Sequence, residues 1–261
     1  MRRDYAVVTG ASSGLGVSLA TELARRGYDL VMVARREKPM QELADRLRDT
    51  FGTSSVIEAL DLAQIGSAAE LHARLGKQGI SPKVLVNNAG FGLNHPFLDE
   101  DPARLQSMLQ LDIVALTELT QIFGRDMREQ GSGHILLVGS LASYQPAPLM
   151  AAYAAAKAYV LSLGEALNVE LAPKVGVTVL SPGLMETEFN DVSGYQTPAS
   201  LRATILSTDR VAEIGLDALF AGKPTVIAGR MNKAIVFSSR LLPRHVSAKG
   251  TYRMAQKSLN T

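Results

Sequence analysis

Residues 9–16 read Thr9-Gly10-Ala11-Ser12-Ser13-Gly14-Leu15-Gly16 and follow directly on the short apolar run Tyr5–Val8. Glycine has no Cβ atom and tolerates positive φ, so this turn lets a ligand come close to its backbone. The helix expected over residues 14–26 would add the positive end of its dipole, which favours a bound pyrophosphate. The spacing is Gly-x3-Gly-x-Gly rather than the Gly-x-Gly-x-x-Gly of the standard fingerprint. The stretch therefore predicts a dinucleotide site, with a plain strand-to-helix turn as the alternative.

Strand and helix patterns alternate from this turn onward. Short apolar runs predict strands at 5–8, 29–33, 55–59, 83–86, 134–138, 175–180 and 224–228. Helical spacing of apolar residues predicts helices at 14–26, 39–49, 67–78, 102–128, 150–171 and 209–221, the last with Asp209 as N-cap. This alternation is typical of an α/β protein with a doubly wound parallel sheet, here of about seven strands. We expect a single domain: residues 1–229 bind coenzyme and substrate, with a mobile lid at about 184–208, and residues 230–261 form a basic tail.

The composition limits the function classes. The 261 residues are 46% hydrophobic with a mean hydropathy of +0.08, which suits a globular protein with a well-filled interior. A formal net charge of +2 gives no reason to expect a nucleic-acid partner. The absence of cysteine excludes disulfides and thiolate catalysis, and the four scattered histidines lack metal-ligand spacing, so no metal is expected. With no signal-peptide pattern and no apolar run of about 18 residues, we expect a cytoplasmic protein.

The end of the second predicted strand bears on the choice of coenzyme. An acidic residue there would bind the ribose 2′-hydroxyl of NAD(H), whereas arginine accommodates the 2′-phosphate of NADP(H). The sequence has Ala34, Arg35 and Arg36, with Glu37 only afterwards. Arg35 is expected to bind the phosphate as a bidentate donor, which predicts NADP(H); the alternative is that both arginines are solvated loop residues. Asp61, after the third strand, could accept from the adenine amino group or cap a helix.

A second motif lies about 125 residues further along. Tyr153 and Lys157 are four apart in a predicted helix and therefore share a face. The lysine ammonium favours the phenolate, so this tyrosine can donate a proton to a developing alkoxide or take one from an alcohol. Ser140 ends the fifth strand, where its hydroxyl can hydrogen-bond a substrate carbonyl. Each residue alone is weak evidence, and the joint arrangement carries the prediction.

In this order, the motifs resemble those of the short-chain dehydrogenases/reductases of about 250 residues. The resemblance rests on Thr9–Gly16, Asp61, Asn87-Asn88-Ala89-Gly90, Ser140, Tyr153-x3-Lys157 and Pro182-Gly183 with Thr187, and it covers residues from about 5 to 190. It implies a Rossmann-type seven-stranded sheet and hydride transfer between NADP(H) and a carbonyl or alcohol. It implies that Tyr153 is the acid/base, that Ser140 stabilises the carbonyl, and that Lys157 binds the nicotinamide ribose. The implied coenzyme-binding residues are Gly10, Ser12, Ser13, Gly14, Leu15, Gly16, Arg35, Arg36, Asp61, Leu62, Asn88, Ala89, Gly90, Tyr153, Lys157, Pro182, Gly183 and Thr187.

One position departs from the family pattern. Family members usually have an asparagine in the helix before the fifth strand, where it supports a water that links to the lysine. Here the context is Leu111-Asp112-Ile113. Asp112 is similar in size and could accept from that water, but its charge would offset part of the lysine's field and oppose ionisation of Tyr153. We therefore predict that activity survives with a shifted pH dependence; alternatively, Asp112 only faces another polar group.

The tail is distinctive in charge. Residues 230–261 hold seven of the 27 lysines and arginines and none of the 25 acidic residues, which gives the tail +7 and the remainder −5. We favour a helix packed over the substrate cleft with a solvated basic face over contact with an anionic membrane surface. Many family members end after the seventh strand and use that strand in a tetramer contact. We expect the tail to block this contact, so that the protein forms a homodimer through helices 102–128 and 150–171. The small residues Ala154–Ala156 would allow these helices to approach closely.

The leading hypothesis is an NADP(H)-dependent reductase of a lipophilic ketone or aldehyde. The expectation that the substrate is lipophilic rests on Leu184, Met185 and Phe189 of the predicted lid and on the apolar residues of the tail. The reverse reaction on an alcohol uses the same groups, so the sequence does not set the direction. The alternatives of another class are a non-catalytic NADP(H)-binding regulator on the same fold and a membrane-surface interaction protein. A pure sensor would not need Ser140, Tyr153 and Lys157 together.

Overall fold

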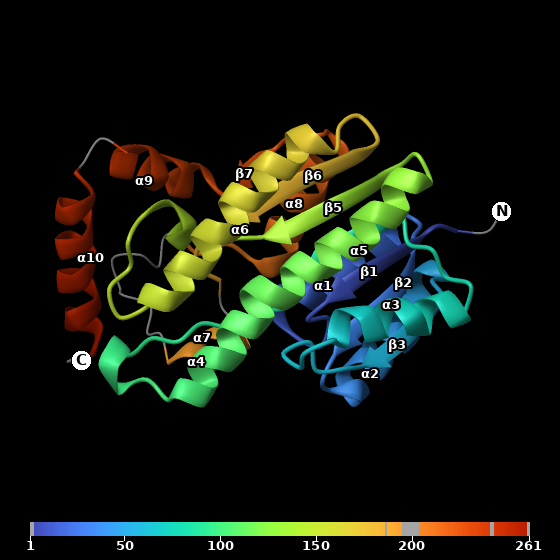
Figure 1. The fold of residues 1–261 in the computed structure, drawn as a ribbon, viewed down its shortest axis with the longest axis horizontal. Helices are drawn as coiled ribbons and strands as arrows, with labels where there is room; N and C mark the ends of the chain where they lie inside the picture. Colours follow the sequence, from blue (N-terminus) through green and yellow to red (C-terminus); the bar gives the residue numbers. More distant parts are fainter. Residues whose placement is uncertain (1–2, 186, 195–203, 241–242, 260–261) are drawn as a thin grey trace.

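The computed structural model describes residues 3–185, 187–194, 204–240 and 243–259, and its centre is a seven-stranded sheet (Figure 1). All neighbouring strands are parallel, in the order β3-β2-β1-β4-β5-β6-β7. The predicted doubly wound Rossmann-type sheet is confirmed. The strands are β1 (Tyr5–Thr9), β2 (Asp29–Ala34), β3 (Ser55–Ala59), β4 (Val84–Asn87), β5 (Gly133–Val138), β6 (Val175–Ser181) and β7 (Thr225–Ile227).

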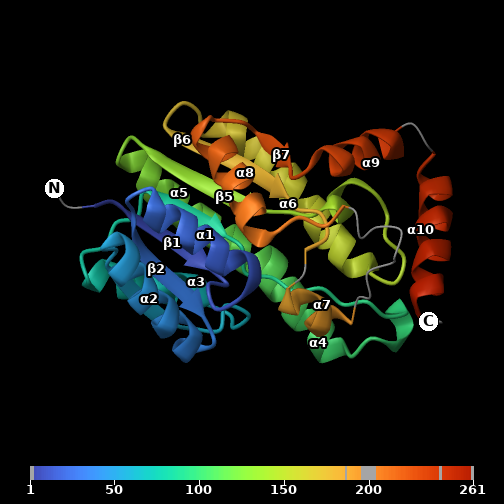
Figure 2. The ribbon, with the colours of Figure 1, turned by 180° about the vertical axis from the view of Figure 1, so that it is seen from behind.

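Helices cover both faces of the sheet (Figures 1 and 2). The apolar core on one face comes from α1 (Gly14–Arg25), α2 (Glu37–Phe51) and α8 (Thr208–Phe220). The core on the other face comes from α3 (Ser67–Lys77), α5 (Leu116–Glu129) and α6 (Ala151–Glu170). Successive strand residues point to opposite faces: Ala6 and Val8 of β1 enter the first core, and Val7 enters the second. This double burial explains why the strands are continuous apolar runs in the sequence.

The helix predicted over 102–128 is interrupted. It consists of α4 (Pro102–Leu109), the π-helical segment η2 (Gln110–Ala115) and α5. A π turn adds one residue per turn, so it changes which side chains face the protein interior. Here it turns Asp112 inward, where the side chain is fully buried. This irregularity is therefore what brings Asp112 to the end of β4 and to α6.

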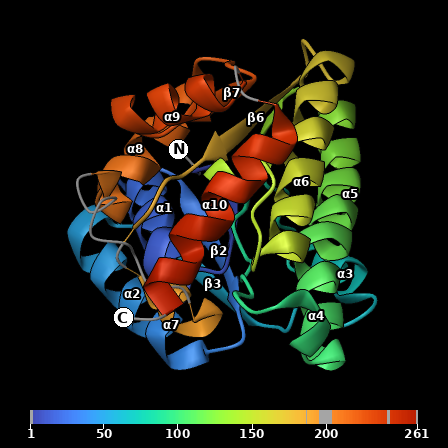
Figure 3. The same ribbon diagram turned by 90° about the vertical axis from the view of Figure 1, so that its left-hand side faces the viewer.

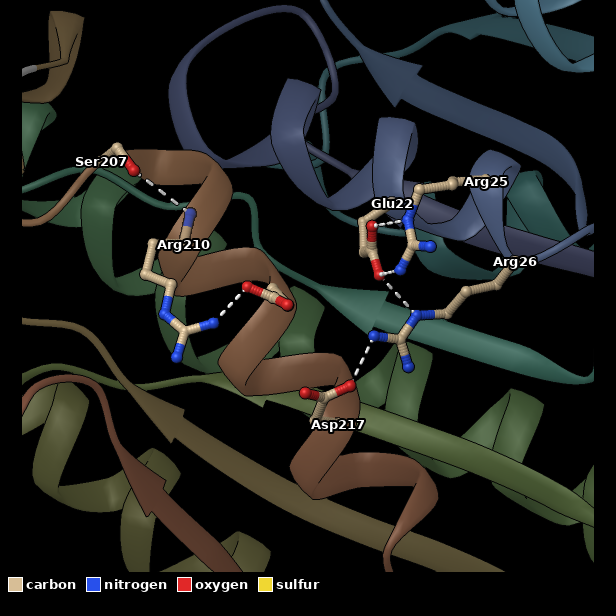
Figure 4. A network of polar contacts seen from close by, with 7 residues as sticks. Glu22, Arg25, Arg26, Ser207, Arg210 and Asp217 are labelled. Carbon is tan, nitrogen blue, oxygen red and sulfur yellow. Dashed lines mark hydrogen bonds and ion pairs between the residues drawn. The ribbon is translucent and has the colours of Figure 1, made fainter.

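Two polar contacts and an ion-pair network join α8 to α1, the helix that follows the glycine-rich turn. The Ser18 hydroxyl lies 2.8 Å from Thr208 Oγ1 and donates to Asp209 Oδ1 at 2.6 Å. Figure 4 shows Arg26 between Glu22, at 2.7 Å, and Asp217, at 2.6 Å. The prediction that Asp209 caps α8 is wrong, because the helix begins at Thr208 and the Ser207 hydroxyl accepts from the Arg210 amide, as Figure 4 also shows. Asp209 instead binds α1.

The tail forms two helices, α9 (Arg230–Arg240) and α10 (Arg244–Leu259). Figure 3, seen from the end of the molecule at which the parallel strands finish, shows α10 in front of that end. The Ser247 hydroxyl donates to Gln145 Oε1 at 3.0 Å, so one face of α10 packs on the loop after η3 (Leu141–Tyr144). Arg230, Lys233, Arg244, Lys249 and Arg253 are exposed. No helix within the described ranges is both long and apolar enough to cross a membrane.

Candidate functional site

The glycine-rich turn between β1 and α1 has a shape that requires glycine. Gly10 and Gly14 have φ values of +69° and +53°, which side chains rarely adopt. A methyl group added at Gly16 would overlap the Gly10 carbonyl oxygen. The end of β4 fixes this turn, because the Asn88 side chain donates to Thr9 O at 2.8 Å and the Asn88 amide donates to Thr9 Oγ1 at 2.9 Å. The result is a close cradle at the start of a helix, which fits a bound pyrophosphate.

The arginines after β2 lie beside this turn. Arg36 Nη2 is 3.4 Å from Ser12 O and 3.5 Å from Ser12 Oγ. The same nitrogen forms an ion pair with Glu188 Oε2 at 2.8 Å, which the sequence did not indicate. Arg35, the residue expected to bind a phosphate, is exposed at the same strand end. The structure thus brings one cation, Arg36, to the edge of the nucleotide cradle.

Asp61 follows β3 and is partly buried, and the next residue, Leu62, is buried. Its carboxylate accepts from the Ala63 amide at 3.0 Å. The alternative that Asp61 caps the next helix is wrong, because α3 begins at Ser67 with Gly66 as its N-cap residue. The predicted contact of Asp61 with adenine stays a prediction.

The three residues expected to be catalytic meet where β5 ends and α6 begins. Tyr153 and Lys157 both lie on the buried face of α6, with Lys157 Nζ 5.7 Å from the centre of the Tyr153 ring. The Ser140 side chain hydrogen-bonds Tyr153 and also accepts from the Ala142 amide at 3.1 Å. Ser140 is the N-cap of the short helix η3, which fixes its position. A hydroxyl, a phenol and an ammonium are therefore held within one cluster.

Burial dominates the electrostatics of this cluster. It raises the pKa of the Tyr153 phenol above its ordinary value, while the Lys157 ammonium and the Ser140 hydrogen bond lower that pKa and the Asp112 carboxylate raises it. The sequence analysis weighed the charges of Lys157 and Asp112 but not burial, and so expected the pKa of Tyr153 to be lowered. The expected opposition between Lys157 and Asp112 is present in the structure.

Asp112 contacts the lysine directly. Asp112 Oδ2 is 3.1 Å from Lys157 Nζ, and Asp112 Oδ1 accepts from the Phe91 amide at 3.1 Å. Burial raises the pKa of Asp112 and Lys157 opposes that rise, whereas the adjacent carboxylate keeps the pKa of Lys157 above its ordinary value. Lys157 also donates to Val138 O at 3.2 Å. The structure thus has a buried ion pair at the position where the sequence analysis expected an interaction through water.

The segment after β6 lies against the catalytic cluster. Gly183 lies against Asn232 of α9, a residue that sequence reasoning missed; the Asn232 side chain donates to Ala228 O at 2.7 Å. The carbonyl of Pro182 accepts from the Leu141 amide at 3.1 Å. Phe189 packs on Tyr153 with ring centres 5.6 Å apart. Of the predicted lid, residues 186 and 195–203 lie outside the described residues, so its extent and mobility stay predictions.

Comparisons with known sequences agree with this geometry. The family model for short chain dehydrogenases matches residues 4–196. The 11-beta-hydroxysteroid dehydrogenase A of Sesamum indicum is 33% identical over 191 residues, which are 72% of this chain and 54% of that protein. A very-long-chain 3-oxoacyl-CoA reductase of Podospora anserina is 34% identical over 174 residues, which are 65% of this chain and 51% of that protein. The chain spans about half the length of these curated relatives.

Solved structures match over more of the chain. A short-chain dehydrogenase from Sphingobium yanoikuyae in complex with NADPH has a TM-score of 0.80 at 29% identity, with 91% of this chain and 94% of that chain covered. The bulky-bulky ketone specific alcohol dehydrogenase from Comamonas testosteroni has a TM-score of 0.77 at 28% identity, with 92% and 93% covered.

Proposed function

Because this chain belongs to the short-chain dehydrogenase family, an oxidoreductase family whose fold binds a nicotinamide coenzyme, we propose that it reduces a lipophilic ketone or aldehyde with NADP(H). The observation that carries the proposal is the meeting of Ser140, Tyr153 and Lys157 at the same sheet edge as the glycine-rich cradle. The reverse oxidation of an alcohol would use the same groups.

The choice of NADP(H) rests on the residues around the end of β2. The cations Arg35 and Arg36 lie there with the Ser12 hydroxyl, and they would hold a 2′-phosphate as charge-assisted donors. The first acidic residue after the strand, Glu37, is the first residue of α2 and is exposed. The relative from Sphingobium yanoikuyae, which was solved with NADPH, supports the same choice.

The lipophilic substrate is proposed from the surroundings of Tyr153. Its ring belongs to an apolar cluster with the buried Leu93 and Met108, separate from the two cores on the sheet faces. Phe91, Leu105, Leu109, Ala142, Met150, Ala152 and Phe189 pack against this cluster. An apolar pocket with a few polar groups is the common form of a small-molecule site. The steroid, long-chain acyl and bulky-ketone relatives support a large apolar substrate.

The proposed mechanism follows from the donors in the cluster. A bound nicotinamide coenzyme would supply the hydride to the carbonyl carbon of the substrate. Tyr153 donates its phenolic proton to the carbonyl oxygen of the substrate, and Ser140 hydrogen-bonds that oxygen as negative charge develops on it. Lys157 stabilises the tyrosinate that remains, because its ammonium is close to the ring and is held there by Asp112 and Val138 O.

The test is a panel of carbonyl compounds offered with NADPH or NADH to the wild-type protein and to Tyr153→Phe. We expect NADPH oxidation with bulky ketones, little oxidation of NADH, and loss of turnover in the variant. Coenzyme binding without turnover of any compound would support the non-catalytic regulator instead. Equal use of NADH would refute the role given to the arginines.

We also propose a homodimer through α5 and α6. Val169 is 77% exposed on α6, and the exposed Tyr159 of α6 makes a 3.0 Å hydrogen bond to Thr117 of α5, so the two helices form one continuous face. Light scattering that gives a tetramer would contradict this. We propose that the basic face of the tail is solvated and does not bind a membrane surface. Co-sedimentation with anionic vesicles, measured for the full chain and for a chain lacking residues 230–261, tests this proposal.

A further inference from the structure

Three consecutive side chains after β6 lie on three different parts of the site. Thr187 rests on the glycine-rich turn, because a Cβ atom at Gly14 would come within 3.3 Å of Thr187 Cβ. Glu188 forms the 2.8 Å ion pair with Arg36 described above. Phe189 packs on the ring of Tyr153. Residues 187–189, which include the start of α7 (Glu188–Ser193), therefore lie across the nucleotide cradle from the arginine end to the catalytic end.

The surroundings of Glu188 are those of a bound anion. Its carboxylate pairs with Arg36, which keeps the pKa of Glu188 below its ordinary value, and the Ser13 side chain adds a smaller effect of the same sign. The same Arg36 nitrogen also points at Ser12 O and Ser12 Oγ. These side chains from the turn and from the end of β2 are the donors that the proposed function assigns to the coenzyme. A carboxylate of the chain itself thus lies at the position proposed for the 2′-phosphate.

We propose that Glu188 is a coenzyme-specificity residue, whose carboxylate holds the Arg36 anion site and is displaced by the 2′-phosphate of NADP(H). The inference rests on the proposed use of NADP(H), and it assigns to Glu188 the effect of weakening NADP(H) binding. NADH carries no 2′-phosphate, so its binding does not require Glu188 to leave Arg36. Glu188 therefore reduces the difference in affinity between NADP(H) and NAD(H) that the two arginines create.

The size of the effect follows from the exposure of the pair. The side chains of Arg36 and Glu188 are 50% and 57% exposed, so water screens their attraction. Exposed ion pairs of this kind change an equilibrium by roughly two- to fivefold. Removing the carboxylate is thus expected to tighten NADPH binding by about that factor, and salt at about 1 M is expected to abolish most of the difference.

The experiment measures direct binding by calorimetry on the full chain, with NADPH, NADH, adenosine 2′-monophosphate and adenosine 5′-monophosphate as probes. The two monophosphates test the phosphate site without the nicotinamide half. Glu188→Gln removes the carboxylate and keeps the side-chain size. The matched control is Glu37→Gln, which removes an equal charge next to Arg36 in the sequence, from an exposed residue at the start of α2.

We expect Glu188→Gln to bind NADPH and adenosine 2′-monophosphate about two- to fivefold more tightly than the wild type, with NADH and adenosine 5′-monophosphate unchanged. Glu37→Gln should give less than half of that gain. Weaker NADPH binding by Glu188→Gln would overturn the proposal, because the ion pair would then close over the coenzyme rather than compete with it. An equal gain for NADPH and NADH would overturn it as well.

The outcomes also separate this inference from the proposed function. If the wild-type protein prefers NADPH and Glu188→Gln changes nothing, only the role of Glu188 fails. If the wild type binds neither dinucleotide, the proposed function fails and the role of Glu188 falls with it. Unchanged melting temperatures of the two variants would show that altered folding does not account for the result.

Discussion

Replacing Asp112 with asparagine removes one charge from the buried pair with Lys157 and keeps the size of the side chain. Asp112 is fully buried, Lys157 is 4% exposed, and the two charged atoms are 3.1 Å apart. At an effective dielectric constant near 20, two unit charges at that separation attract by about 5 kcal/mol. Desolvation offsets much of this attraction in a buried pair. The part of the interaction that remains after this offset is still large enough to change the ionisation of the neighbouring Tyr153 phenol.

The direction of the change follows from the signs of the charges. Asp112 raises the pKa of Tyr153, and Lys157 lowers it. With the lysine nitrogen 5.7 Å from the ring centre, its effect is about 3 kcal/mol on the same scale. The effect of Asp112 on the phenol is opposite in sign to that of Lys157 and smaller. Asp112→Asn is therefore expected to lower the pKa of Tyr153.

The assay is kcat/KM for carbonyl reduction with NADPH between pH 6 and 10. Tyr153 must be protonated to act as the acid, so reduction is lost as pH rises through its pKa, and the alkaline limb should move toward lower pH in the variant. Glu129→Gln, an exposed residue at the end of α5, is the control for net charge and should not move the limb. An unchanged limb, or one displaced to higher pH, would refute the reasoning.

Three further predictions concern other parts of the chain. Tyr153→Phe should lower kcat by about 10²- to 10⁴-fold with NADPH binding retained, as measured by turnover beside calorimetry. Gly16→Ala forces a methyl group onto the Gly10 carbonyl, so it should destabilise the fold by about 1–3 kcal/mol and weaken NADPH binding at least about tenfold in denaturation and binding measurements. Burial lowers the pKa of His134 below its ordinary value, so the unfolded chain binds the proton more readily, and stability falls as pH drops below about 6.5. His134→Gln should therefore lose less melting temperature between pH 7.5 and 5.5 than the wild type; an equal loss would contradict this.

The sequence predicted the elements whose signals are local. Strands buried on both faces are apolar runs, so β1 to β6 lie within one or two residues of their predicted bounds, and β7 is shorter than predicted. The glycines at 10, 14 and 16 indicated the nucleotide cradle because a steric requirement is visible in the residue type itself. The shared face of Tyr153 and Lys157 followed from helix geometry alone.

The remaining features depend on contacts between distant parts of the chain. Arg36 and Glu188 are 152 residues apart, so no local pattern shows that they pair. The π turn at η2 has no simple periodic signature, and the direct contact between Asp112 and Lys157 depends on it. Asp209 has a residue type suited to an N-cap, but Ser18 of α1 offers its carboxylate a partner and Ser207 takes the cap.

The separation of charge along the chain affects the association rate of a dinucleotide. The tail carries +7 and the rest of the chain −5, and α10 lies in front of the end at which the parallel strands finish (Figure 3). Part of this positive charge therefore lies at the end of the sheet where the glycine-rich turn follows β1. A polyanionic dinucleotide diffusing toward that end is steered by the field, so its association rate would fall with ionic strength more steeply than a net charge of +2 implies.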